Sequence, residues 1–121
     1  MHISDDVQLF AQMLGELGLK RNISRAIAYL RDGKEATSRD LEIGADLRQP
    51  EVSITMRELL ELDWVEVRQD KKPGKGRPYN IYKLKKPVSA IIEELEQKKL
   101  QESKEILESI QRLKELAGKD E

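Results

Sequence analysis

The sequence QPEVSITMRELLELDWVEVR, residues 49–68, and the nearby KGRPYNIYKL, residues 75–84, together decide the fold. In the first stretch, four apolar side chains recur at the spacing of one helix face: Val52, Met56, Leu59 and Leu60. Pro50 suits the first turn of this helix, where a backbone N–H has no partner within the helix. After Asp63, apolar and polar residues alternate in WVEVRQ and again in YNIYKL, which predicts two β-strands. We therefore expect a helix over residues 50–62 followed by a β-hairpin.

The hairpin is expected to have a long basic tip, from Asp70 to Arg77. Residues 64–86 contain eight Lys or Arg and two Asp or Glu, a net charge of +6, while residues 1–63 carry −4 and residues 87–121 carry −3. The near-neutral total of −1 therefore conceals one basic segment. A local excess of Lys and Arg is typical of a surface that binds a polyanion. The alternative is a mobile lysine-rich loop without a partner.

Three helices are predicted ahead of this unit. Each begins at a side chain that can accept a hydrogen bond from the first helical turn: Ser4, Asn22 and Ser38. Apolar residues at helical spacing predict the buried faces: Val7, Phe10, Leu14 and Leu17 in the first helix, Ile23, Ala26, Ile27 and Leu30 in the second, Leu41 and Ala45 in the third. The first helix is expected to end at Gly15 and Gly18, and the stretch GKEAT, residues 33–37, is expected to be a turn.

The residues after Pro87 predict one long helix, because no proline or glycine occurs before Gly118. A helix of this length spans about 45 Å. Apolar residues follow it at spacings of mostly four and three and form a predicted dimerisation seam: Val88, Ile92, Leu95, Ile106, Ile110 and Leu113. Lys99 and Glu102 interrupt the seam in the middle. The helix could instead pack on its own domain, but its length favours a partner, and we expect a homodimer.

A winged helix-turn-helix domain has this same order of elements: helices first, and then a hairpin with a basic tip. The sequence resembles the ArsR-like and TrmB-like winged-helix transcriptional regulators of bacteria and archaea over residues 10–86. The resemblance rests on Gln49-Pro50 at the helix start, Ser53 on its groove side, Met56 with Leu59 inside, and Asp63-Trp64-Val65 at the strand entry. It implies an α+β fold with two parts. Residues 1–86 would form the DNA-binding domain and residues 87–121 a coiled-coil-like dimerisation segment.

The sequence departs from these families in three respects. It lacks the Cys and His ligands of the metal-responsive ArsR members, and it lacks the effector domain of full-length TrmB regulators. The glycine usual before the first wing strand is Asp63 here. We therefore predict no metal and no cofactor, and the resemblance implies no particular effector.

The resemblance places the predicted helix of residues 50–62 in the major groove of duplex DNA. The residues expected to contact base edges are Gln49, Ser53, Ile54, Thr55 and Arg57. The wing residues expected on the DNA backbone or in the minor groove are Arg68, Lys71, Lys72, Lys75 and Arg77. Glu51 and Glu58 would repel phosphate, so at least one is expected to point away from it. The alternative is that these polar residues form only a solvated helix face.

Composition excludes several other classes of protein. The chain has no cysteine and one histidine, His2, so it lacks thiol nucleophiles, disulfides and a histidine metal site, and we expect no enzyme. No apolar run approaches the roughly 20 residues that span a bilayer, and we expect a cytoplasmic protein. The function predicted is a homodimeric, sequence-specific transcriptional regulator. The alternative is a winged-helix module that binds proteins in a transcription or repair assembly.

Overall fold

The computed structural model describes residues 4–71 and 76–120. Residues 1–3, 72–75 and 121 lie outside the described residues, and they include Lys72 and Lys75 of the predicted wing. The chain divides into two compact units, Met1–Ile91 and Ile92–Glu121. The elements in chain order are α1 (Asp5–Glu16), α2 (Arg21–Leu30), β1 (Ala36–Thr37), α3 (Ser38–Gly44), α4 (Gln49–Glu61), β2 (Val65–Asp70), β3 (Tyr79–Leu84) and α5 (Val88–Lys119).

Helix α1 begins where the sequence predicts. The Ser4 hydroxyl accepts a hydrogen bond from the Val7 backbone N–H at 3.3 Å, which satisfies one of the N–H groups that have no partner within the helix. Val7 and Ala11 pack against Ala28 of α2. Leu17 was expected on the buried face, but it follows the last helical residue and is exposed.

Helix α2 has the predicted apolar face, but Asn22 does not cap it. The N-cap residue is Lys20, and it makes no side-chain capping hydrogen bond. The Asn22 amide instead donates to Glu51 Oε2 at 3.1 Å and so ties α2 to α4. The predicted core residues of this helix are all buried: Ile23, Ala26, Ile27 and Leu30.

The segment before α3 contains a short strand that the sequence does not reveal. Ala36 and Thr37 form β1 and pair with Tyr82 and Ile81 of β3, where a turn was predicted. Thr37, one residue before the predicted cap Ser38, begins α3. Its side chain accepts from the Asp40 N–H at 3.1 Å, while Asp40 accepts from the Thr37 N–H at 2.9 Å.

The three strands form an antiparallel sheet in the order β1-β3-β2. Val65, Tyr82 and Leu84 share its inner face and are buried, whereas Val67, further out along the hairpin, is 41% exposed. Asp63 precedes β2 with a φ of +63°, in the left-handed region that glycine favours. Asp63 therefore provides the turn for which the resembling families use glycine.

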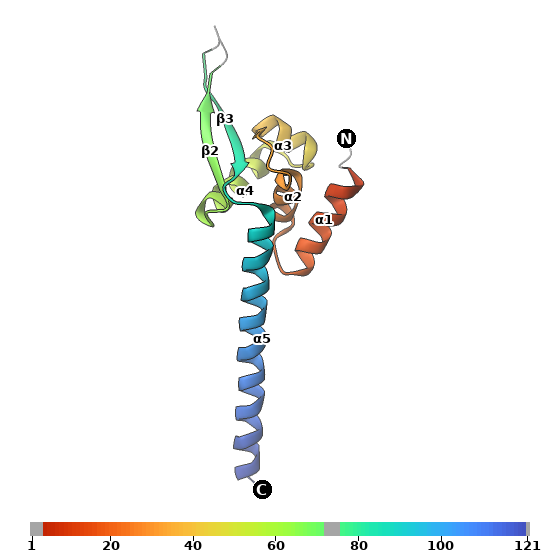
Figure 1. Ribbon diagram of the computed structural model, residues 1–121, viewed down its shortest axis with the longest axis vertical. Coiled ribbons are helices and arrows are strands. Elements are labelled where there is room, and N and C mark those ends of the chain that lie inside the picture. Colours follow the sequence, from red (N-terminus) through yellow and green to blue (C-terminus); the bar gives the residue numbers. More distant parts are fainter. Residues whose placement is uncertain (1–3, 72–75, 121) are drawn as a thin grey trace. The chain divides into compact units, whose positions relative to one another are not determined.

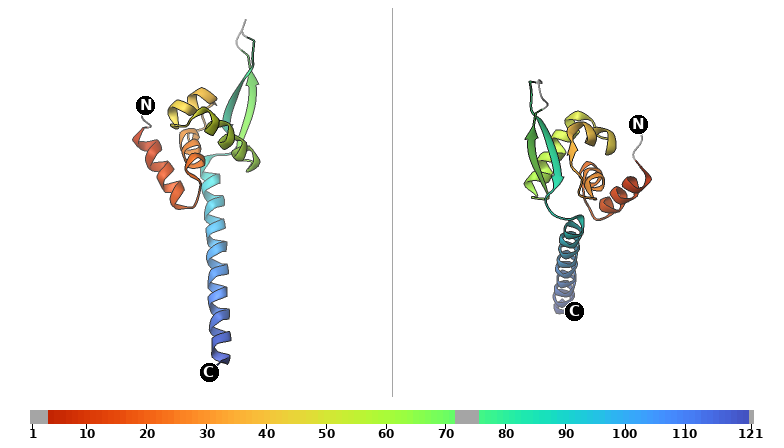
Figure 2. Two further views of the ribbon diagram at one scale, coloured as in Figure 1. Left: turned by 180° about the vertical axis from the view of Figure 1, so that it is seen from behind. Right: turned by 45° about the horizontal axis from the view of Figure 1, so that its top comes forward.

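The first unit is α+β, and its element order and sheet are consistent with a winged helix-turn-helix fold. Figure 1 shows helix α2 between α1 and the hairpin of β2 and β3, and the two views in Figure 2 agree. Helices α3 and α4 meet at a turn in which Asp46 has a φ of +54°. Arg25 Nη1 donates to the Asp46 carbonyl at 3.1 Å, so a side chain of α2 holds this turn.

Helix α5 begins in the first unit and continues through the second. Ile91 is completely buried, and Leu95 is 5% exposed. Beyond Leu95, the described residues of the helix are exposed or, at Glu102, half-buried. The long C-terminal helix is therefore confirmed, with a large apolar surface left open along it.

Candidate nucleic-acid interface

Helix α4 is the predicted recognition helix, and its start is fixed by Glu51. The Arg48 backbone N–H donates to Glu51 Oε1 at 2.8 Å. This hydrogen bond, followed by that from Asn22, lowers the pKa of the Glu51 carboxyl. Pro50 occupies the first turn as predicted. Val52, Met56 and Leu59 are buried in the core as predicted, whereas Leu60 is 37% exposed.

Four of the five predicted base-contacting residues lie on the exposed side of α4. They are Gln49, Ser53, Ile54 and Arg57, which are spaced as neighbours on one helix face. Thr55 is the exception, because it is 3% exposed and packs on the buried side. Thr55 lies three residues after Val52 and four before Leu59, a spacing that places it on the apolar face despite its polar side chain. It is therefore removed from the candidate interface.

Glu51 and Glu58, the two acids of α4 that would repel phosphate, both bind groups of α2 or of its N-cap. Glu58 forms an ion pair with Lys20 at 3.1 Å, and Glu51 accepts from Asn22. Both carboxylates therefore lie toward α2; Lys20 offsets the charge of Glu58, and the neutral Asn22 amide satisfies one oxygen of Glu51. The exposed residues Gln49, Ser53, Ile54 and Arg57 include one cation, and the exposed Glu61 follows one turn after Arg57, at the end of the helix.

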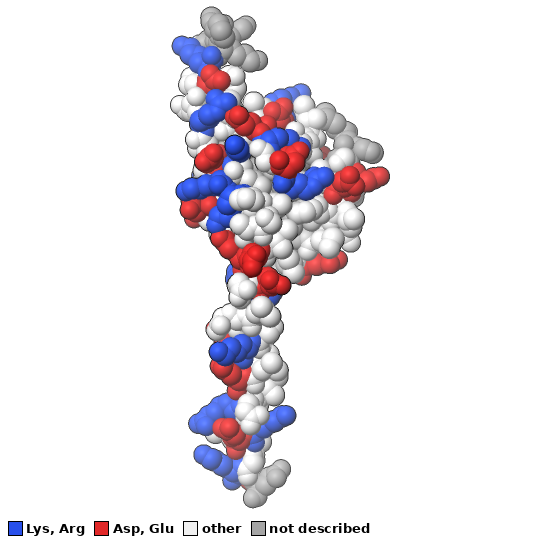
Figure 3. Space-filling model, viewed as in Figure 1, with Lys and Arg blue, Asp and Glu red and all other residues white. Residues whose placement is uncertain are grey.

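Among the described wing residues, Arg68 already pairs with two carboxylates. Arg68 Nη2 lies 2.6 Å from Glu35 Oε2, and Arg68 Nη1 lies 3.4 Å from Asp70 Oδ2. The Glu35 hydrogen bond is the main cause that raises the pKa of Arg68. Lys71 and Arg77 are exposed near the hairpin tip. Figure 3 shows Lys and Arg surface along the hairpin with Asp and Glu surface beside it. Arg68 is thus a weaker candidate for phosphate than Lys71 or Arg77.

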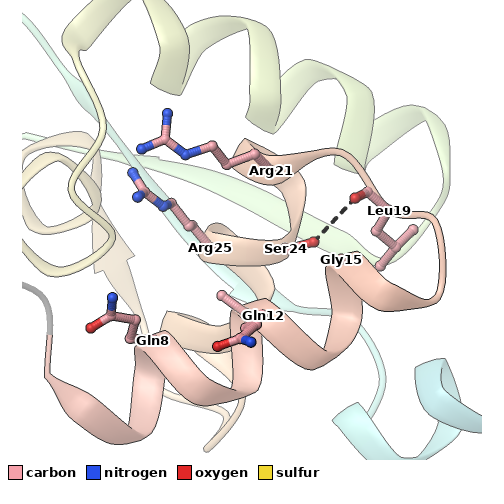
Figure 4. A pocket seen from close by; sticks show the side chains of 8 residues that line it. Gln8, Gln12, Gly15, Leu19, Arg21, Ser24 and Arg25 are labelled. Atoms are coloured by element: carbon pink, nitrogen blue, oxygen red, sulfur yellow. Dashed lines mark hydrogen bonds between the residues drawn. The ribbon is translucent and has the colours of Figure 1, made fainter.

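The structure adds basic residues that the sequence analysis did not single out. Arg21 and Arg25 line an open groove of about 360 Å³ between α1 and α2, opposite Gln8 and Gln12. Figure 4 shows both guanidinium groups extending to the same side of α2. Among the described residues that line this groove, none is Asp or Glu.

Arg21 also lines a second groove, which includes Ile54 and Glu58 of α4, so it lies beside the predicted recognition helix. Arg39 in the first turn of α3 and Arg48 at the start of α4 are exposed as well. Their position at the starts of two consecutive helices was a signal in the sequence, because such ends commonly contact phosphate.

The predicted dimerisation residues fall into two groups. Leu95 is buried within the chain and Val88 is half-buried, so both offer little surface to a partner. The other four are 41–64% exposed: Ile92, Ile106, Ile110 and Leu113. Three exposed leucines that the prediction omitted add to the apolar surface of α5: Leu100, Leu107 and Leu116.

Neither a metal cluster nor a membrane-spanning helix is found among the described residues. In residues 4–71 and 76–120, no group of three or more His, Cys, Asp or Glu side chains is arranged to hold a metal ion. Over the same residues, no helix has the length and apolar composition needed to cross a membrane.

The chain is similar to known proteins in fold alone. No protein-family model and no curated protein matches the sequence. A solved transcriptional regulator matches with a TM-score of 0.55 at 16% identity, covering 84% of this chain and 68% of its own. A possible transcriptional regulator from Methanosarcina mazei Go1 matches with a TM-score of 0.56 at 19% identity, covering 87% of this chain and 86% of its own. The likeness is one of fold.

Proposed function

We propose that this protein is a transcriptional regulator that binds duplex DNA in a sequence-specific manner as a homodimer. Helix α4 enters the major groove, and the hairpin of β2 and β3 lies on the backbone or in the minor groove. The observation that carries the proposal is the composition of the exposed side of α4. It presents Gln49, Ser53, Ile54 and Arg57, while Glu51 and Glu58 of the same helix are bound toward α2.

The chemistry of this face suits DNA. Arg57 has the planar guanidinium that binds guanine O6 and N7 together, Gln49 can bind adenine N6 and N7, and Ile54 can contact a thymine methyl. The major groove is about 12 Å wide and admits one helix. Lys71 and Arg77 of the wing, with Arg21, Arg39 and Arg48, are exposed cations, and in this proposal they neutralise phosphates around the groove. The fold likeness to proteins described as transcriptional regulators supports this role.

The test is selection of genomic DNA fragments by the immobilised full chain, followed by sequencing. We expect enrichment of an inverted repeat, since two recognition helices related by a twofold axis contact two half-sites about 10 base pairs, or a multiple of that, apart. The control is the variant Gln49→Ala/Ser53→Ala/Arg57→Ala, which changes exposed side chains alone and should select no preferred sequence. Enrichment of the same sites by this variant would place recognition elsewhere.

One observation favours a second function, that of a module that binds another protein. Leu9 and Met13 of α1 and Leu17 at its C-cap are 58%, 57% and 38% exposed and recur every four residues, which gives this helix an apolar outer face. A partner helix could cover that face. Binding of a protein partner with no binding of random duplex at low salt would support this function over the first.

A further inference from the structure

The central part of the α5 seam carries one pair of opposite charges. Lys99 Nζ lies 3.2 Å from Glu102 Oε2, and both side chains are more than 40% exposed. The exposed apolar residues Ile106, Ile110 and Leu113 continue the same face toward the C-terminus. Two charges between apolar stretches make the direction of a partner helix matter, because charged residues at such positions determine orientation and register.

A parallel, in-register pair of α5 helices places like charges opposite each other. Lys99 would face Lys99 of the second copy, and Glu102 would face Glu102. The flanking positions would add no attraction, since Lys98 would then lie near Ser103 and Glu105 near Ile110. Like charges in contact across an interface are unfavourable.

An antiparallel pair reverses this pattern. If the twofold axis passes midway between Lys99 and Glu102, each Lys99 faces Glu102 of the other copy, and the contact occurs twice. In the same register, Lys98 flanks Glu105 of the other copy, again twice, and Ile92 lies opposite Ser109 beside Ile110. Charges therefore oppose charges of the other sign, and the exposed Ile92 meets the exposed C-terminal part of the seam.

We propose that the exposed seam of α5 binds a second copy of this chain in antiparallel orientation, with the twofold axis between Lys99 and Glu102. This proposal rests on the homodimer of the proposed function and specifies its geometry. The charge pattern selects a second copy as the occupant because the complement of each charged residue is present on the same helix.

The test uses disulfide formation, for which the chain is well suited because it has no cysteine. The variants are Ile92→Cys, Ser109→Cys and the double variant with both changes. All replace exposed residues, and the control Lys104→Cys lies on another face of the helix. Under mild oxidation we expect a covalent dimer from the double variant and none from either single variant or the control. A covalent dimer from Ser109→Cys alone would overturn the antiparallel orientation.

A charge exchange tests the register by an independent measurement. Lys99→Glu should raise the dissociation constant of the dimer about tenfold or more, since this change places a second carboxylate opposite Glu102 of the other copy. The double variant Lys99→Glu/Glu102→Lys should restore it to near the starting value. Equal dissociation constants for all three proteins would contradict the proposed axis. Light scattering on the unmodified chain separates the two failures: a monomer refutes the homodimer itself, whereas a dimer with the wrong cross-links refutes its orientation alone.

Discussion

At the residue scale, the acidic side chains of α4 decide whether its outer side can approach DNA. Glu51 accepts hydrogen bonds from the Arg48 N–H and from Asn22, and Glu58 pairs with Lys20. Glu51 and Glu58 thus have structural roles on the side of α2, while Glu61 is exposed at the end of the helix. Over the first three turns the outer side presents Gln49, Ser53, Ile54 and Arg57, which is the arrangement that the proposed function needs.

Replacement of Arg57 tests this arrangement directly. Arg57→Ala should cost about 1–3 kcal/mol of binding free energy at one base pair, with little change in salt dependence. The measurement is a titration of the selected operator and of single-base variants of it. Arg68→Ala is the matched control, because Arg68 already pairs with Glu35 and Asp70 and should change binding less. An equal loss on all sequences would show that Arg57 contacts phosphate instead.

A pair of glycine substitutions tests the packing of α3 on α2. A Cβ at Gly44 would overlap the ring of Tyr29, whereas one at Gly15 would meet nothing within 4 Å. Gly44→Ala should lower the free energy of unfolding by about 1–3 kcal/mol. Gly15→Ala, in helix α1, should raise it by up to about 1 kcal/mol. Urea unfolding measures both, and similar effects of the two substitutions would contradict the packing of α2 on α3.

The Glu51 capping interaction predicts a pH dependence of stability. In the folded protein, the pKa of the Glu51 carboxyl lies below its ordinary value of 4.5, because the hydrogen bonds from the Arg48 N–H and from Asn22 stabilise the charged form. The contribution of the Glu51 carboxylate to the stability of the fold is therefore fully present above about pH 4.5, and it is lost as the pH falls through the lowered pKa. Glu51→Gln should reduce the loss of stability on going from pH 6 to pH 3, as measured by urea midpoints. Glu61→Gln, an exposed position on the same helix, should follow the unmodified chain, and a Glu51→Gln curve identical to it would contradict the interaction.

At the element scale, the sequence predicted what depends on periodicity and missed what depends on contacts between elements. The face of α2 and the strands β2 and β3 follow from local spacing, and they are confirmed; the face of α4 is confirmed except at Leu60, which is exposed. Strand β1 is only two residues long, too short to show an alternation of apolar and polar residues. It is a strand because it pairs with β3. Asn22 has the right chemistry for a cap, but Glu51 of another helix binds it. Thr55 has a polar side chain, but its spacing from Val52 puts it on the buried face.

The same distinction applies to the candidate site. Gln49, Ser53, Ile54 and Arg57 could be selected from the sequence because exposure follows from the helical period. The pairing of Arg68 with Glu35 joins residues far apart in the chain and needed the fold. The grooves lined by Arg21 likewise needed the packing of α2 against α1 and α4.

The lysines of the hairpin tip can be tested together as one unit. Replacing Lys71, Lys72 and Lys75 by Ala should reduce the salt dependence of DNA binding by up to roughly 3 units per wing, since each phosphate contact contributes about 0.9. Operator preference should remain. The matched control removes three lysines of α5, Lys104, Lys114 and Lys119, and should leave the slope unchanged. A wing variant with an unaltered slope would mean that the wing does not contact DNA.

At the scale of the whole molecule, the chain combines a small basic wing with a largely acidic remainder. Residues 64–86 carry +6 within a chain of net charge −1. Binding to DNA must therefore depend on local charge at the interface, because the total charge gives no attraction. Local phosphate neutralisation has a distinct signature: the logarithm of the binding constant falls linearly with the logarithm of salt concentration.

The measurement that tests the central claim most directly is the affinity of the full chain for a random-sequence duplex over a range of salt concentrations. If α4 and the wing lie on DNA, the protein binds at low salt, and the logarithm of its affinity declines with a slope of several units, about 0.9 for each phosphate neutralised. Absence of binding at low salt, or an affinity that does not change with salt, would contradict the DNA-binding account.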